Sequence, residues 1–384
     1  MKTKLAFLFG LALSGCNAGS SANNTIKPVT PDTTETTLTD KYDREMISQI
    51  AKASKTLSDE KIWFDYGNWY KSAPIYMLRM DDVNNKDPLK VFLFNPVEPD
   101  KSFQKLGQNE SSGLDTYRND VNMHLANDKI NKLNGMFDFD YKFEKGVYYA
   151  QKYHKLEMSP NNVDHGHKTI DRNISLNIHE NFHKYQLKNF KIPSSFVQVL
   201  DGYPVNAELI ELKLLTLQTF KGLPKSITKS EATSLLKKYV ALTKKQIEID
   251  TSEKRLVENM GLWQELTEGS AKYVETVAIR KMFAHAKDST FVYSWFLENE
   301  YKTAKEVKEQ FGFGIFYETG AAAIWLLNQA GYDLKKLESG VSPYQAATEL
   351  LGDSFDYDLE LLNLYATTPN ASEIKYKAKE LARL

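Results

Sequence analysis

Residues 174–183 read Ile-Ser-Leu-Asn-Ile-His-Glu-Asn-Phe-His and carry the pattern that decides the fold of the C-terminal part. His179 and His183 are four residues apart, so on a helix their side chains lie on one face, one turn from each other. Two imidazoles placed in this way can bind one zinc ion at about 2.0–2.1 Å. Glu180 follows the first histidine and would face the open side of the metal, where it can take a proton from a bound water. We therefore expect a buried helix that carries a zinc site.

A second helix-like segment, residues 263–275, reads Trp-Gln-Glu-Leu-Thr-Glu-Gly-Ser-Ala-Lys-Tyr-Val-Glu. Its Glu-Gly-x-Ala-x-Tyr pattern resembles the zinc-binding helix of the gluzincins, the zinc peptidases that include thermolysin and the aminopeptidase N family. The resemblance implies that Glu268 is the third metal ligand, and a carboxylate in this place would leave the fourth position for water. Glu265, one turn earlier, is an alternative ligand.

Other residues of this segment have expected roles as well. Gly269 and Ala271 are small and would let the segment pack closely on the helix that carries the two histidines. Glu275 lies on the same face as Glu268 and can orient a histidine from outside the ligand set.

A third segment begins at Phe316 and reads Phe-Tyr-Glu-Thr-Gly-Ala-Ala-Ala-Ile-Trp-Leu-Leu. It resembles the Tyr-x-x-Gly start of the helix whose tyrosine stabilises the tetrahedral intermediate in aminopeptidase N-like enzymes. The resemblance implies that Tyr317 donates a hydrogen bond to the developing oxyanion. The alternative is a core tyrosine at the start of an apolar helix.

The chain also departs from the aminopeptidase N pattern. The interval between His183 and Glu268 is far longer than the corresponding interval in aminopeptidase N, and the Gly-x-Met-x-Asn substrate strand of those enzymes is absent. Aminopeptidase specificity is therefore not implied, and the choice between endo- and exopeptidase stays open. Residues 147–153 are expected as the edge strand that pairs with an extended peptide substrate.

The remaining pattern predicts an α+β fold, with a strand-containing N-terminal lobe and a predominantly helical C-terminal lobe. The resemblance implies a gluzincin-like bilobed arrangement. The strand-like runs are residues 75–80, 91–94, 136–143 and 147–153, the last two forming a hairpin. The helical runs are residues 40–58, 174–189, 207–220, 229–249, 253–284, 317–329, 358–365 and 372–384. Capping boxes at Thr228 and Ser342 mark two helix starts. The pairs Trp63-Phe64 and Trp69-Tyr70 are expected in the core.

The N-terminus, Met-Lys-Thr-Lys-Leu-Ala-Phe-Leu-Phe-Gly-Leu-Ala-Leu-Ser-Gly-Cys, resembles a bacterial lipoprotein signal. The resemblance implies cleavage before Cys16, lipidation of that residue and attachment to a membrane through the lipid alone. Asn17 in the next position favours the outer membrane, facing either the periplasm or the cell surface. The expected domains are a signal peptide (1–15), a flexible tether (16–40), an N-terminal lobe (41–173) and a helical zinc-binding lobe (174–384).

The composition restricts the function further. The 384 residues are 42% hydrophobic and 26% charged, with a formal net charge of −1, which is typical of a globular protein. Because no polybasic run occurs, we expect no nucleic-acid partner. The one cysteine excludes an internal disulfide and a thiol-ligated structural zinc site.

Together these patterns predict a membrane-anchored, zinc-dependent hydrolase with a peptide or protein substrate, and a peptidase is the favoured activity. The alternative is a binding or scaffold lipoprotein that keeps the peptidase fold without turnover. His165 and His167 offer a second pair of possible metal ligands, but their polar surroundings favour a solvated loop.

Overall fold

The computed structural model describes residues 39–81, 88–120, 133–155, 163–164, 167–197, 199–286, 290–292, 300–352 and 355–384, and of residues 120, 163–164 and 167–171 it describes the backbone alone. The described residues fall into two compact units, one within Met1–Ser48 and Pro74–Lys155 and the other within Gln49–Ala73 and Leu156–Leu384. The strand-containing part precedes a mostly helical part, so the predicted α+β layout is confirmed. The domain limits predicted from the sequence stay predictions.

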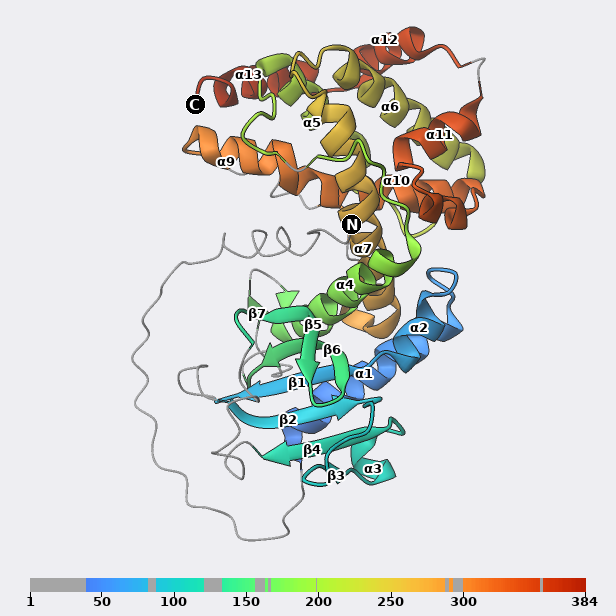
Figure 1. The fold of residues 1–384 in the computed structure, drawn as a ribbon. Helices are drawn as coiled ribbons and strands as arrows, with labels where there is room; N and C mark the ends of the chain where they lie inside the picture. The colour runs from blue at the N-terminus through green and yellow to red at the C-terminus, as the bar shows by residue number, and fades with distance from the viewer. Residues whose placement is uncertain are drawn as a thin grey trace. The chain divides into compact units, whose positions relative to one another are not determined.

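The first unit is built on a mixed six-stranded sheet in the order β3-β4-β2-β1-β6-β5. Its elements, drawn in blue to green in Figure 1, are β1 (Ile75–Met80), β2 (Pro88–Phe94), β3 (Gln104–Lys105), α3 (Gln108–Ser111), β4 (Thr116–Asp120), β5 (Phe137–Phe143) and β6 (Gly146–Tyr153). β1 pairs antiparallel with β2 and parallel with β6, while β5 and β6 form the predicted hairpin. The apolar face of this sheet is aromatic, with Tyr76 close to Tyr141 and Phe143.

The position of β6 corrects one expectation. Residues 147–153 were expected at the edge of the sheet, free to pair with a peptide, but β6 is hydrogen-bonded on both sides, to β1 and to β5. The parallel pairing of β1 with β6 causes this, because it joins strands far apart in the sequence. The strands at the two ends of the sheet order are β3 and β5.

A buried group of charged side chains lies beside the sheet, at the start of α1 (Lys41–Asp59). The carboxylate of Asp43 is fully buried and pairs with the guanidinium of Arg79 and the ammonium of Lys90, each at 2.9 Å. The hydroxyl of Tyr153 donates to the same carboxylate at 3.0 Å. A buried anion held by two cations and a hydroxyl ties the helix to the strands.

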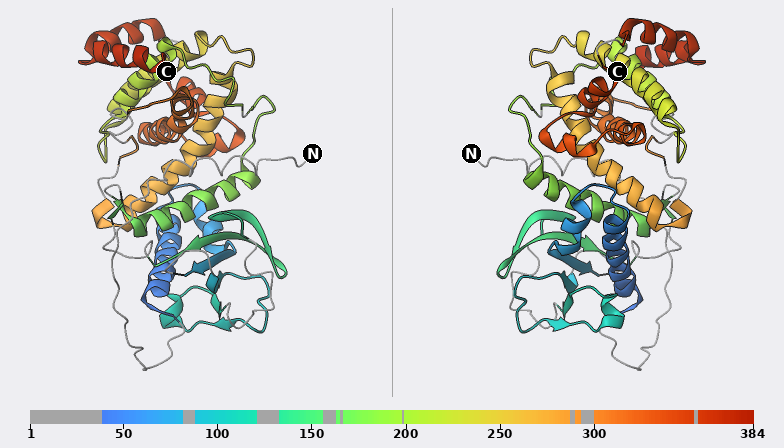
Figure 2. Two further views of the ribbon diagram at one scale, coloured as in Figure 1. Left: turned by 90° about the vertical axis from the view of Figure 1, so that its left-hand side faces the viewer. Right: turned by 90° about the vertical axis from the view of Figure 1, so that its right-hand side faces the viewer.

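The second unit is helical. Its elements, in addition to the end of α1, are α2 (Tyr66–Ser72), β7 (Val163–Asp164), β8 (His167–Lys168), α4 (Thr169–Asn189), α5 (Ala207–Phe220), α6 (Lys229–Glu248), η2 (Val257–Gly261), α7 (Leu262–Met282), η3 (Ala284–Ala286), α9 (Ala304–Glu309), η4 (Gln310–Gly314), α10 (Ile315–Ala330), η5 (Leu334–Ser339), α11 (Pro343–Leu351), α12 (Tyr357–Thr367) and α13 (Ala371–Leu381). α7 packs along α4 on one side and along α10 on another, and Figure 2 shows the green α4 and the orange α7 side by side.

Local sequence signals account for the helix starts that were predicted. The hydroxyl of Thr228 accepts from the backbone N–H of Glu231, whose carboxylate accepts from Thr228 in return. Ser342 and Gln345 form the same reciprocal pair at the start of α11. Both capping boxes are therefore confirmed.

Two π-helical turns were not predicted. η2 and η4 immediately precede α7 and α10, and both turns end on a glycine, Gly261 and Gly314. As a result, α7 proper begins at Leu262, nine residues after the start expected from periodicity.

The helix that Gly269 of α7 packs against also differs from the expectation. A Cβ atom on Gly269 would lie 2.6 Å from the Cα atom of Gly320 on α10, so Gly269 allows close packing with α10 and not with α4. Successive residues point about 100° apart around a helix, because one turn takes 3.6 residues. Since Glu268 faces α4, its neighbour Gly269 faces another helix.

The aromatic pairs before and within α2 are only partly in the core. Trp63 and Tyr70 are buried and Trp69 is half-buried, but Phe64 is 69% exposed, so its assignment to the core was wrong. Trp63 and Phe64 are adjacent in a turn, where neighbouring side chains point in different directions.

Candidate metal centre

The helix α4 is held in place by aromatic side chains of α2. The hydroxyl of Tyr66 donates to the carbonyl of Ile178 at 2.8 Å, and the hydroxyl of Tyr70 donates to the side-chain oxygen of Asn177 at 2.6 Å. The ring of Tyr66 also packs edge-on against Phe182, with 4.8 Å between the ring centroids. These buried contacts sit beside His179 in the chain and fix the orientation of the helix.

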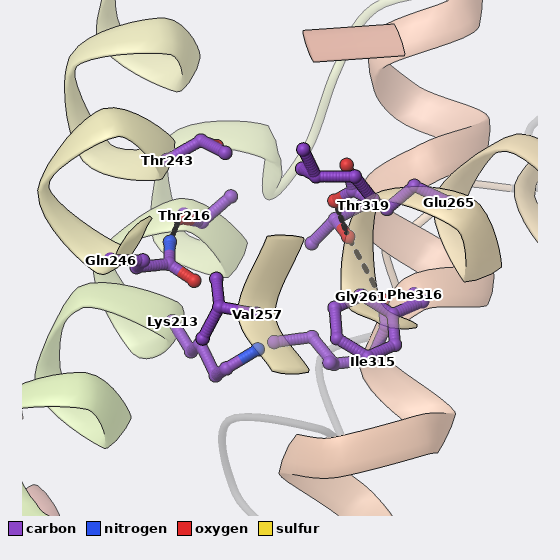
Figure 3. Close-up of a pocket in the computed structure, with 11 residues that line it drawn as sticks. Lys213, Thr216, Thr243, Gln246, Val257, Gly261, Glu265, Ile315, Phe316 and Thr319 are labelled. Atoms are coloured by element: carbon purple, nitrogen blue, oxygen red, sulfur yellow. Dashed lines mark hydrogen bonds between the residues drawn. The ribbon is translucent and has the colours of Figure 1, made fainter. Parts of the chain in front are cut away.

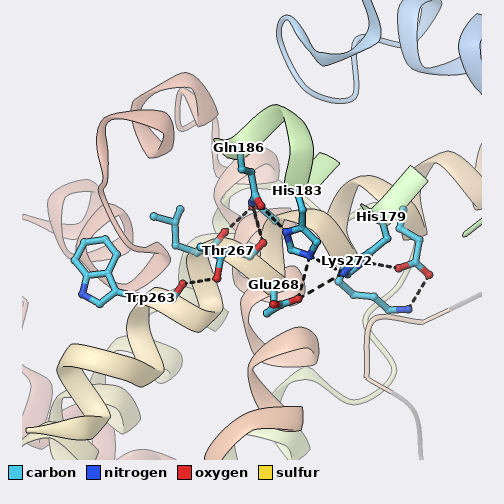
Figure 4. Close-up of polar contacts among 10 residues, drawn as sticks. His179, His183, Gln186, Trp263, Thr267, Glu268 and Lys272 are labelled. Atoms are coloured by element: carbon cyan, nitrogen blue, oxygen red, sulfur yellow. Dashed lines mark hydrogen bonds and ion pairs between the residues drawn. The ribbon is translucent and has the colours of Figure 1, made fainter. Parts of the chain in front are cut away.

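His179, His183 and Glu268 come together in the interior of the second unit (Figure 4). The two Nε2 atoms of the histidines are 3.0 Å apart. The Oε2 atom of Glu268, on α7, lies 3.5 Å from Nε2 of His179 and 3.2 Å from Nε2 of His183. The structure thus brings the predicted pair and a carboxylate from a distant helix to one point.

Hydrogen bonds on the other ring nitrogens decide which atoms face this point. Nδ1 of His179 lies 3.0 Å from the Oε2 atom of Glu275, and a carboxylate can only accept, so Nδ1 carries the proton. Nδ1 of His183 lies 2.7 Å from the Oε1 atom of Gln186. The expected contact of Glu275 with a histidine is present, whereas no sequence signal singled out Gln186.

The distances among the three convergent atoms fit a divalent metal. In a tetrahedral zinc site with bonds of about 2.0–2.1 Å, two ligand atoms lie roughly 3.3–3.4 Å apart. The observed separations of 3.0, 3.2 and 3.5 Å are close to that value. Oε2 of Glu268 is buried and accepts no hydrogen bond among the described residues. Two imidazole nitrogens and a carboxylate oxygen that converge in this way could hold a metal ion.

The pKa values of His179 and Glu268 reflect how closely the two side chains lie together. Burial disfavours the charged form of His179, but hydrogen bonds to Glu268 and Glu275 outweigh burial and raise its pKa to about 10. Burial also opposes the ionised form of Glu268, yet the charge of His183 and its other contacts lower the pKa of Glu268 to about 2. In the metal-free protein, a proton therefore occupies the place of the cation at neutral pH.

Glu180 lies in the same buried neighbourhood without an equally strong partner. Burial raises the pKa of Glu180 to about 7, and the charges of His179 and His183 counteract only part of this effect. Its Oε2 atom has no hydrogen-bond partner among the described residues. A carboxyl group with this pKa can both accept and return a proton near neutral pH.

Tyr317 lies next to the first histidine. Its ring stacks on the ring of His179, with centroids 5.8 Å apart and planes inclined by 12°. Burial raises the pKa of Tyr317 well above its usual value, and the charge of Glu268 and a hydrogen bond to it add to the shift. The hydroxyl is therefore neutral at pH 7 and able to donate.

Glu265 does not join this group. It faces a small cavity of about 10 Å³ between α5, α6, α7 and α10, where Thr319 donates to it at 2.6 Å (Figure 3). The hydroxyl of Tyr239 donates to it as well. Burial raises its pKa despite these bonds and the charge of Lys213. The structure thus brings Glu268, and not Glu265, to the histidines.

The cavity is small, and its lining mixes polar and apolar side chains. Burial lowers the pKa of Lys213 to about 7, and its ammonium lies 4.4 Å from the ring centroid of Phe316. A volume of this size holds about one water molecule.

Some predicted features lie outside the described residues. These are the signal peptide, Cys16, nearly all of the tether, and His165; of His167 the backbone alone is described. Among the described residues, no helix combines the length and the apolar character that crossing a bilayer would require.

Comparisons with known proteins add no relative. No protein-family model matches this chain, and neither the curated proteins nor the solved structures give a significant match. What can be said about function therefore follows from the buried His179, His183 and Glu268 group, which can hold a metal ion.

Proposed function

We propose that this protein is a zinc-dependent hydrolase that cleaves peptide bonds and is attached to a bacterial membrane through a lipid on Cys16. The observation that carries the proposal is the convergence of two histidine Nε2 atoms and one glutamate oxygen, from two helices, at separations of 3.0–3.5 Å. Two histidines and a carboxylate are the ligand set of catalytic zinc sites in peptidases.

In this proposal His179, His183 and Glu268 hold the zinc ion. Zinc supplies Lewis acidity, which polarises a carbonyl and makes water a nucleophile near neutral pH. The chain supplies the dry surroundings, because all three side chains are buried. A low dielectric strengthens every electrostatic interaction at the site.

Glu180 is the proposed general base. Its carboxylate takes a proton from the attacking water and later returns it to the amine that leaves. The pKa of about 7 supports this role, because the group is then partly ionised at neutral pH and can act in both directions.

Tyr317 is the proposed oxyanion donor. A neutral phenol stacked beside His179 can donate its proton in a hydrogen bond to the oxygen that becomes negative during attack. Its raised pKa supports this role, because the hydroxyl keeps its proton at pH 7.

The order of the three segments, from His179 through Glu268 to Tyr317, is the order found in gluzincins, which supports a peptide substrate. The signal-like segment that ends at Cys16 supports attachment to the outer membrane by lipid. The tether would then let the folded part move relative to the membrane surface.

Elemental analysis tests the metal part of the proposal. We expect one zinc ion per wild-type chain and none in His183→Ala, because that variant loses one of the three ligands. A peptide library screened with and without a chelator tests the reaction. Cleavage that the chelator abolishes supports the peptidase, whereas zinc binding without cleavage would favour the scaffold alternative.

A further inference from the structure

Gln186 is one helical turn beyond His183 on α4, and its side chain makes three polar contacts. Its Oε1 atom lies 2.7 Å from Nδ1 of His183. Its amide nitrogen donates to the carbonyl of Thr267 and to the hydroxyl of Ser270, each at 2.8 Å, and both acceptors are on α7. The side chain is 4% exposed, so water does not compete for these bonds.

These contacts determine the orientation of the amide and the tautomer of the histidine. A backbone carbonyl can only accept, so the side-chain atom of Gln186 next to Thr267 must be its nitrogen. The atom that faces His183 is then the oxygen, which also can only accept. Nδ1 of His183 therefore carries a proton, and Nε2, 3.2 Å from Glu268, is the nitrogen that can bind a metal.

The same amide joins the two helices that carry the ligands. Thr267 is the residue immediately before Glu268, so the bond from Gln186 ends one residue from the third ligand. One planar group thus fixes both the ring of His183 and the position of α7 against α4. The separation of 3.2 Å between His183 and Glu268 depends on both.

The two histidines differ in their outer partners. His179 is held by the carboxylate of Glu275, which Lys272 contacts at 3.0 Å, whereas His183 is held by a neutral amide. A second carboxylate at residue 186 would add negative charge to the centre and would lose both donors to α7.

We propose that Gln186 is a positioning residue of the candidate metal centre, which holds His183 with Nε2 directed toward Glu268 and keeps His183 and Glu268 in register across the two helices. This inference rests on the zinc site of the proposed function. It concerns a residue that would not contact the metal.

The test uses full-length protein and three variants. Gln186→Met removes every polar contact at nearly constant volume. Gln186→Glu keeps an acceptor for Nδ1 of His183 and removes the donors. Ser270→Ala is the matched control, because it removes one partner on α7 and leaves the acceptor for His183 in place. Zinc affinity is measured by competition with a chelator, and the Nδ1 proton of His183 is followed by NMR in the zinc-loaded protein.

We expect Gln186→Met to weaken zinc binding roughly 10- to 100-fold and to lose the slowly exchanging Nδ1 proton signal. Gln186→Glu should keep that signal and recover part of the affinity, because it keeps the acceptor for His183 but loses both donors to α7. Ser270→Ala should weaken binding by less than about tenfold. Wild-type affinity and an unchanged signal in Gln186→Met would overturn the inference and leave the zinc site standing.

A purely structural role gives a different pattern. In that case Gln186→Met and Gln186→Glu would lower the melting temperature of the chelator-treated protein alike, and Gln186→Glu would recover no affinity, which also overturns the inference. Failure of the wild-type protein to bind zinc would overturn both the proposed function and this inference.

Discussion

Each unit of the protein buries a group of charged side chains, but the two groups are balanced in different ways. In the first unit, the carboxylate of Asp43 accepts hydrogen bonds from Arg79, Lys90 and Tyr153. In the second unit, two histidine Nε2 atoms and the Oε2 atom of Glu268 converge within 3.5 Å of one another. The first group contains its own cations, whereas the second could hold a metal ion.

This difference distinguishes a cluster whose charges are paired with one another from a group that could hold a metal ion. The kind of side chain decides it, because imidazoles and carboxylates are ligands of divalent metals, whereas Arg79 and Lys90 already pair with Asp43.

The sharpest test of this contrast is Glu180→Gln, which changes the charge beside the metal centre without removing a ligand. We expect the zinc content to stay at one ion per chain and the rate of peptide hydrolysis to fall roughly 10²- to 10⁴-fold, since the base is lost. Elemental analysis and a peptide cleavage assay measure the two quantities on the same sample. Retained hydrolysis in the zinc-loaded variant would remove Glu180 from its proposed role.

The corresponding change in the first unit is Asp43→Asn. It leaves buried Arg79 and partly buried Lys90 with only their longer contacts to Asp40, and should lower the free energy of unfolding by about 3–5 kcal/mol. Urea unfolding measures this loss, which should be the same with and without a chelator, and the zinc content of the folded protein should not change. A loss that appears only in the presence of zinc would mean that the two groups are coupled.

Tyr317→Phe tests the residue that stacks on His179 and holds no metal. Loss of one oxyanion donor lowers kcat roughly 10²- to 10³-fold, because the developing charge loses a hydrogen bond, and the ring itself is kept. Steady-state kinetics at saturating substrate give the value, and zinc affinity is the control. An unchanged kcat would assign Tyr317 to packing alone.

The smallest expected effect is the dependence of zinc binding on pH. The pKa of His179 is raised to about 10 in the metal-free protein, so below that pH a bound proton must leave when zinc binds. Affinity should therefore rise with pH, by about tenfold per pH unit between pH 6 and 8, where one proton is released. Chelator competition at several pH values measures the slope. A slope near zero would mean that His179 is neutral before the metal binds.

The pKa of His179 also predicts how the stability of the metal-free protein changes with pH. A raised pKa means that protonated His179 stabilises the metal-free fold below its ordinary pKa of 6.5, and this contribution is lost as the pH rises toward 10. The metal-free protein should therefore melt at a lower temperature at pH 9 than at pH 7, and zinc should reduce the difference.

Much of the candidate site could be predicted, since a helix places His179 and His183 on one face whatever surrounds it. The contact of Glu275 with a histidine also followed from helical spacing. Gln186 could not be predicted, because glutamine is common on helices and its role appears only when Thr267 is beside it. The choice between Glu268 and Glu265 likewise required the positions of α4, α5 and α6.

The sequence alone determined the features that depend on neighbours within a few residues: the α+β order of the elements, the hairpin of β5 and β6, the capping boxes and the paired histidines. Only the tertiary structure decided that β6 is an inner strand, that Gly269 packs on Gly320 and that Glu268 reaches the histidines. The physical reason is the range of the interactions. Periodicity and capping act over one or two helical turns, whereas strand neighbours and ligand sets arise when segments far apart in the chain pack together.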